Sequence, residues 1–112
     1  MKCETLDVWK RSCRLSVNVY KLFIDSKDFG FKDQITRSSL SVASNIAEGL
    51  EKDSNKEKAR FIEISKGSAA ELITQVYIGI EIGYIEKSVG MIWVKETDEI
   101  LKMLSGLKRN YV

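Results

Sequence analysis

Apolar residues recur every three or four positions along almost the whole chain, the spacing that places side chains on one face of an α-helix. The pattern predicts four helices, over residues 5–26, 32–52, 55–82 and 87–108. The 112-residue chain contains no proline, the residue that most often interrupts segments of this length. We therefore predict an all-α fold in a single domain spanning residues 1–112.

The first predicted helix is apolar on two sides. One line comprises Leu6, Trp9, Cys13, Val17, Tyr20 and Ile24, and a line on nearly the opposite side comprises Val8, Leu15, Val19 and Leu22. A surface helix of a monomer needs only one apolar face. We therefore expect the back of this helix to pack on another molecule, for which a second subunit is the economical candidate.

The second predicted helix is crowded with small residues, which allow helices to approach closely. They are Ser38, Ser39, Ser41, Ala43, Ser44, Ala47 and Gly49. In the third predicted helix, Gly67 and Gly79 each lower helix propensity by about 1 kcal/mol relative to alanine. We expect close helix packing to compensate for this loss, so that Gly67→Leu should disrupt packing and lower stability or the assembly state.

Turn signals separate the predicted helices. The turn SKDFGF, which contains Gly30, is expected to end the first helix. Ser54 and Glu57 have the spacing of a capping box that starts the third helix, and Gly83 can adopt the left-handed conformation that ends it. Short connections between long amphipathic helices favour antiparallel neighbours, so the predicted architecture is an up-down-up-down four-helix bundle.

Composition and hydropathy limit the cellular compartment and the partners that we expect for the protein. The net charge is only +2, and no apolar run approaches the roughly 18 residues that a membrane span requires. The N-terminal segment lacks the apolar core of a signal peptide, so we expect a cytoplasmic protein without a membrane partner. Cys3 and Cys13 should then stay reduced, and the apolar line around Cys13 predicts a buried thiol.

Histidine is absent, which removes the commonest general base and the commonest metal ligand. The sequence also lacks a glycine-rich phosphate loop and a metal-ligand spacing, so we predict no catalytic residue, no cofactor and no metal.

The most suggestive polar residues are Arg37, Asn45, Glu48, Arg60 and Glu71. They are either a ligand or acid–base site or, as we predict, a structural ionic network. Antiparallel second and third helices should bring Glu48 near Arg60. The same pairing should bring Arg37 near Glu71.

Basic residues form two groups that are candidates for nucleic-acid binding. The first comprises Lys10, Arg14 and Lys21 on one side of the first helix, with Arg11 nearby, and the second comprises Lys52, Lys56 and Lys58 at the second turn. Either group could contact phosphates, and either could simply be a solvated face. In a ring of subunits, a weak basic stripe is repeated and its local field grows.

Specific motifs recur along nearly the whole chain. They are Leu6-Asp7-Val8-Trp9, Val19-Tyr20, Phe29-Gly30-Phe31, Gln34-Ile35, Arg37, the segment SNIAEG from Ser44 to Gly49, Ser54, Glu57, Arg60-Phe61, Gly67-Ser68, Glu71-Leu72, Gln75 and Gly83-Tyr84. Together they resemble a bacterial family of four-helix-bundle proteins, formerly classed as ribosomal proteins and encoded in intervening sequences of large-subunit ribosomal RNA genes. The chain departs from the family at Ala43, where proline is usual, and at Glu51, where the family tends to have glycine or a basic residue.

The resemblance implies a bundle that assembles into a ring-like homopentamer, and it does not imply an enzyme. A relative is the accessory variability protein of diversity-generating retroelements, whose basic surfaces contact nucleic acid and a reverse transcriptase. We therefore expect a non-enzymatic oligomeric scaffold that binds RNA or DNA through basic surfaces repeated around the ring. The alternative is a protein-interaction module, such as a reverse transcriptase accessory or a host-factor adaptor, with no nucleic-acid binding of its own.

Overall fold

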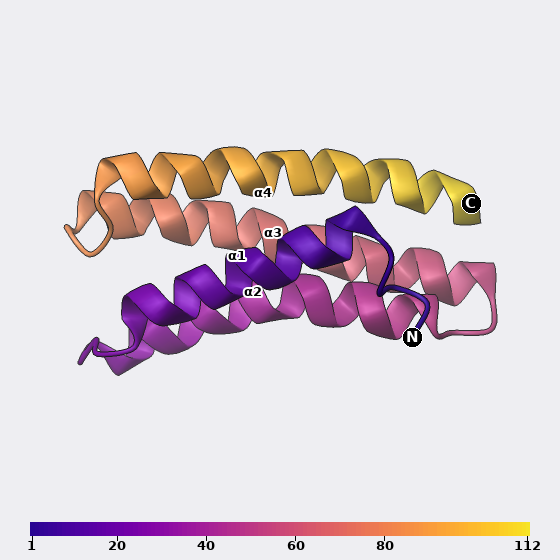
Figure 1. Ribbon diagram of the computed structural model, residues 1–112, viewed down its shortest axis with the longest axis horizontal. Coiled ribbons are helices and arrows are strands. Elements are labelled where there is room, and N and C mark those ends of the chain that lie inside the picture. The colour runs from indigo at the N-terminus through magenta and orange to yellow at the C-terminus, as the bar shows by residue number, and fades with distance from the viewer.

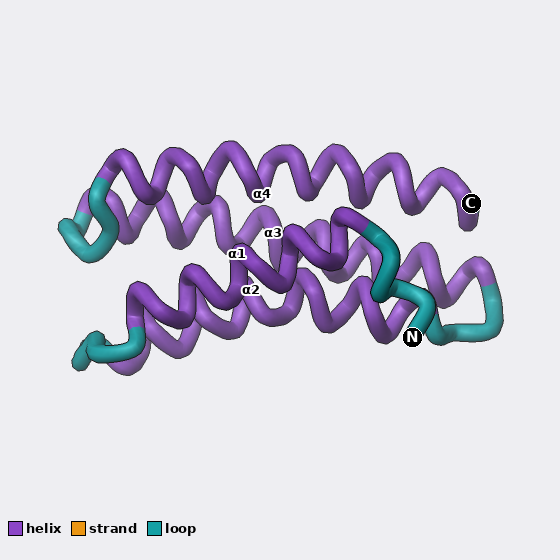
Figure 2. Tube along the Cα trace, in the orientation of Figure 1, coloured by secondary structure: helices purple, strands orange, loops and turns teal.

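Four helices follow one another in alternating directions, as Figure 1 shows. The computed structural model describes all 112 residues. Helix α1 comprises Asp7–Phe23, α2 Phe29–Leu50, α3 Asn55–Glu81 and α4 Lys87–Lys108, and a short 3-10 turn, η1, covers Arg109–Tyr111. Short loops join the helices (Figure 2), and the bundle measures 43 by 22 by 20 Å. The predicted all-α four-helix bundle is confirmed.

The helix ends differ from the prediction most clearly at the first turn. Helix α1 ends at Phe23, and α2 begins at Phe29 instead of residue 32. The cause is Asp28, whose side chain accepts a hydrogen bond from the backbone N–H of Phe31 at 3.1 Å and so caps α2. A turn does follow α1 here, as predicted, but Gly30 lies inside the first turn of α2 and not in that connection.

Local signals set both ends of α3. The Ser54 hydroxyl accepts the backbone N–H of Glu57 at 3.1 Å, but the reciprocal half of the capping box does not form, because the Glu57 carboxylate binds Arg60 instead. At the other end, Gly83 has a φ of 85°, which glycine adopts without strain. The N–H groups of Gly83 and Tyr84 donate to carbonyls of the last turn, as in a Schellman motif.

Small residues bring α2 close to both of its neighbours. The hydroxyls of Ser16 and Ser39 lie 3.1 Å apart between α1 and α2. Those of Ser41 and Ser68 lie 2.8 Å apart between α2 and α3. The predicted close approach along α2 is therefore present, and each buried hydroxyl has a partner.

Gly67 does not take part in this packing. A Cβ placed on Gly67 would have no atom within 4 Å, and the residue is exposed. A Cβ on Gly79, in contrast, would lie 2.5 Å from Cδ1 of Ile85. The prediction of close packing within the bundle is correct for Gly79 and wrong for Gly67, because Gly67 faces away from the other three helices.

The core runs along the bundle axis. Its fully buried side chains include Val19, Ile35, Ile46, Ile62, Leu72, Val76, Ile100 and Leu104. Packing around the axis is uneven, because α3 packs extensively on α2 and α4 whereas α1 and α4 pack least and diverge toward the α1–α2 loop (Figure 1). None of the helices combines the length and the hydrophobicity that crossing a membrane requires.

Candidate functional site on helix α1

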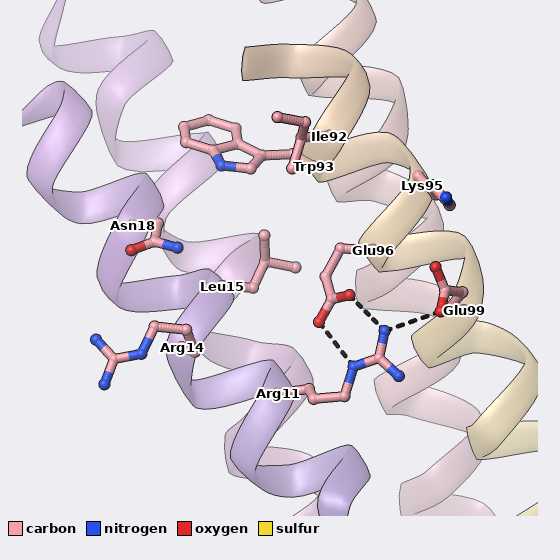
Figure 3. Close-up of a pocket in the computed structure, with 9 residues that line it drawn as sticks. All are labelled: Arg11, Arg14, Leu15, Asn18, Ile92, Trp93, Lys95, Glu96 and Glu99. Atoms are coloured by element: carbon pink, nitrogen blue, oxygen red, sulfur yellow. Dashed lines mark hydrogen bonds and ion pairs between the residues drawn. The ribbon is translucent and has the colours of Figure 1, made fainter. Parts of the chain in front are cut away.

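A groove of about 540 Å³ lies where α1 and α4 diverge. Its lining residues are Arg11, Arg14, Leu15, Asn18, Ile92, Trp93, Lys95, Glu96 and Glu99, shown in Figure 3. Leu15 and Trp93 are buried beneath it, whereas Ile92 is 67% exposed. Arg14 and Lys95 extend away from the centre of the groove (Figure 3), so the cations do not converge on one point as they would around a small anionic ligand.

An ionic clasp, defined as Arg11, Glu96 and Glu99, joins α1 to α4 beside this groove. Arg11 Nε donates to Glu96 at 2.8 Å, and its Nη2 donates to both Glu96 and Glu99. The bidentate hydrogen bonds from Arg11 lower the pKa of Glu96 and, with Glu99, raise the pKa of Arg11. Sequence reasoning placed Arg11 only beside a basic stripe, because its partners lie 85 and 88 residues away.

A second groove, the apolar groove, has a volume of about 390 Å³ and runs along α1 and α2. It is lined by Cys13, Ser16, Val17, Tyr20, Lys21, Ile24, Leu40 and Ala43. Several of these side chains are exposed, including Tyr20 at 41%, Leu40 at 48% and Ile24 at 66%. One apolar line of α1 therefore faces the core and the other faces outward, which leaves a large apolar surface without a partner in this chain.

The two cysteines differ in burial. Cys13 lies in the wall of the apolar groove and is partly exposed, so the predicted buried thiol is wrong there. Cys3 is completely buried in the core, beneath the N-terminal turn that precedes α1. Burial raises the pKa of both thiols, so both stay protonated and weakly nucleophilic near neutral pH.

A basic line follows the apolar groove along α1. It comprises Lys10, Arg14 and Lys21, which are exposed and form no ion pair within the chain. Helix α1 contains four basic residues and one acidic residue, a larger positive excess than that of the whole chain. The first predicted basic group is therefore available to a partner.

The second predicted basic group is largely engaged within the bundle. Lys58 Nζ donates to the carbonyl of Leu50 at 3.1 Å and also binds the carbonyl of Lys52, which satisfies groups at the end of α2. Lys52 Nζ lies 5.0 Å from the ring centroid of Phe61. Of the three lysines, Lys56 alone makes neither kind of contact.

The expected ionic network between α2 and α3 is not formed. Arg60 Nε binds Glu57 at 2.8 Å rather than Glu48, because Glu57 lies one turn away on the same helix. This hydrogen bond is the main cause of the raised pKa of Arg60, to which the charge of Glu48 adds less.

Arg37 likewise binds a residue of its own helix, Asp33, at 3.1 Å rather than Glu71. The Asn45 amide donates to the Ser41 carbonyl at 2.8 Å, also within α2. Arg37 and Glu71 do line one shallow depression of about 370 Å³, but Glu48 is not part of it.

The outer side of α3 forms the α3 stripe, defined as Ile64, Gly67, Glu71, Ile78 and Ile82. Successive members lie three, four or seven residues apart along α3, so they share one helix face. Ile78 and Ile82 are 48% and 49% exposed. The isoleucines of the α3 stripe are therefore left uncovered by this chain, on either side of Gly67 and Glu71.

The distinctive features of this small helical bundle are therefore outer faces that lack a partner. A family model described as 23S rRNA-intervening sequence protein matches residues 4–106, and the chain belongs to that family. The fold is similar to the crystal structure of a protein with unknown function from the S23 ribosomal protein family of Bacteroides thetaiotaomicron VPI-5482. The TM-score is 0.84 and the identity 25%, over 90% of this chain and 97% of that one. None of the curated proteins matches the chain.

Proposed function

We propose that the protein is a non-enzymatic scaffold that self-associates and binds RNA or DNA. The observation that carries the proposal is the apolar groove, where Tyr20, Ile24 and Leu40 stay exposed in the single chain. Leaving such a surface in water is unfavourable, by about 25 cal/mol for each Å². A closed ring of subunits, which the family resemblance implies to be a homopentamer, would cover this surface in every copy.

Light scattering and sedimentation over a dilution series test the oligomeric half of this proposal. A pentamer has five times the 12.7 kDa mass of the chain. Assembly should be concentration-dependent, because association follows mass action. A mass of one chain at every concentration would refute self-association.

The basic line Lys10, Arg14 and Lys21, together with Lys56, supports the nucleic-acid half, because these cations have no acidic partner within the chain. Titration with structured fragments of 23S ribosomal RNA should show binding that weakens steeply with salt. Parallel titration with a DNA duplex of equal length shows whether binding depends on the 2′-hydroxyl of RNA. Absence of binding at low salt would refute this half alone.

The apolar groove also favours the second candidate, a module that binds another protein such as a reverse transcriptase or a host factor. An amphipathic helix of that protein would lay its apolar side along Val17, Tyr20 and Leu40. Affinity capture after nuclease treatment should then recover one protein in fixed ratio, and Val17→Glu should abolish its recovery. Recovery that depends on intact RNA would contradict this candidate.

A further inference from the structure

We infer that neighbouring copies of this chain meet with the outer face of α1 of one copy packed on the outer side of α3 of the next. The first face consists of the apolar groove and the basic line Lys10, Arg14 and Lys21. The second face is the α3 stripe together with Glu81. This pairing rests on the proposed self-association, and it specifies which two surfaces make the contact.

The α3 stripe contains a glycine that nothing within the chain explains. Gly67 lies in the middle of a helix, where glycine lowers helix propensity relative to alanine, yet no atom lies within 4 Å of the position of its Cβ. On the same face, Ile78 and Ile82 are about half exposed. Because glycine has no side chain, the helix backbone is accessible between the exposed isoleucines, and a helix of another molecule can approach it closely.

The charges of the two faces are complementary. Between Gly67 and Glu81 the only charged residues of α3 are Glu71 and Glu81, and neither forms an ion pair within the chain. The distance between them along the helix is about 15 Å, at 1.5 Å for each residue. Lys10 and Lys21 lie about 16 Å apart on α1 by the same measure, so the spacings match.

The position of the two faces requires that different copies supply them. Helices α1 and α3 are diagonal in the bundle, because each packs on α2 and α4 and they do not contact each other. Their outer sides therefore point in opposite directions, and one chain cannot bring them together. A contact between two different surfaces repeats from one copy to the next. It generates a closed ring when the rotation between neighbouring copies permits closure. In such an assembly the basic line faces the neighbouring copy, so of the cations that support nucleic-acid binding only Lys56 at the α2–α3 turn stays free.

Charge reversal on each face tests the pairing, with the mass in solution as readout. The variants are Lys10→Glu with Lys21→Glu, Glu71→Lys with Glu81→Lys, and all four changes in one chain. Each double variant should raise the dissociation constant about tenfold or more, since attraction becomes repulsion, and the fourfold variant should restore assembly. Lys95→Glu, on α4 and part of neither face, is the matched control and should leave the mass unchanged.

Gly67→Leu provides a steric test that does not depend on charge. The side chain meets nothing within its own chain, so the helical content and the unfolding of the dissociated protein should not suffer, while assembly is lost. Double variants with the wild-type mass, or a fourfold variant that stays dissociated, would overturn the pairing. So would a Gly67→Leu protein that assembles normally. A wild-type protein that is monomeric would instead refute the proposed self-association itself.

Discussion

Replacing Gly49 by alanine should push α2 and α3 apart where their hairpin is tightest. A Cβ placed on Gly49 lies 2.7 Å from the Cβ of Phe61 and 3.4 Å from the carbonyl oxygen of Lys58. The Cβ of Phe61 is attached directly to the backbone of α3, so it cannot rotate aside as the end of a long side chain can. The substitution must therefore shift a helix or distort its backbone.

Two contributions of opposite sign determine the change in the free energy of unfolding. Alanine gains up to about 1 kcal/mol of helix propensity over glycine. Overpacking a close-packed interior costs about 1–3 kcal/mol, and a contact with a backbone-anchored carbon belongs in the upper part of that range. We expect Gly49→Ala to lower the free energy of unfolding by about 1–2 kcal/mol, which for a chain of this size lowers Tm by about 4–8 °C.

Urea and thermal unfolding, followed by circular dichroism at one fixed protein concentration, measure this change. The matched control is Gly30→Ala in the first turn of the same helix, where the new Cβ meets only Asp28 Oδ1 at 3.8 Å. This control should be as stable as the wild type or more stable by up to about 1 kcal/mol. If Gly49→Ala is also stabilised, α2 and α3 do not pack as closely as the distance to Phe61 indicates.

Substitutions at three other positions test separate parts of the structure. Glu96→Gln removes the charged acceptor of Arg11 and should lower the free energy of unfolding by about 1–2 kcal/mol at neutral pH. This lies between the losses typical of exposed and of buried ion pairs. Because the folded pKa of Glu96 lies below its ordinary 4.5, this stabilisation is complete above pH 4.5 and disappears as the pH falls through the folded value. A difference between variant and wild type that persists at low pH would contradict the role of the clasp. Asp28→Ala should lower Tm, because it removes the cap of α2 and the acceptor of Tyr84, whereas Asp28→Asn should retain most of the stability. Equal loss in both would contradict capping. Ile62→Ala, at a fully buried position, should lower the free energy of unfolding measured in urea by about 2–5 kcal/mol. A loss below about 1 kcal/mol would mean that the core is not packed there as described.

The sequence predicted the helices well because helix formation depends on signals that are local in the chain. The spacing of apolar residues marked all four helices, and the start of α3 at Ser54 and its end at Gly83 followed from single residues. The start of α2 was missed because Asp28 acts as a cap in competition with the more conspicuous Gly30. The serines of α2 were correctly associated with close packing, since small side chains have this consequence wherever a neighbour lies beside them.

Contacts between distant residues were predicted much less well. The bridges expected for Arg37 and Arg60 do not form, because each arginine finds a carboxylate one turn away on its own helix. Such a neighbour is always within reach, whereas a bridge between helices also depends on the rotation of both. For the same reason, the partners of Arg11 on α4 could not be anticipated.

By itself, the sequence determined that this chain forms an antiparallel bundle and that α1 has more apolar surface than one core can cover. Periodicity carries that information, because every residue of a helix has a fixed direction relative to its neighbours. The tertiary structure alone decided which apolar line of α1 faces inward, that Gly67 faces outward, and that the basic face of α1 and the acidic half of α3 lie on opposite sides. These outcomes depend on how each helix is rotated against the other three, which is settled by packing of the whole core.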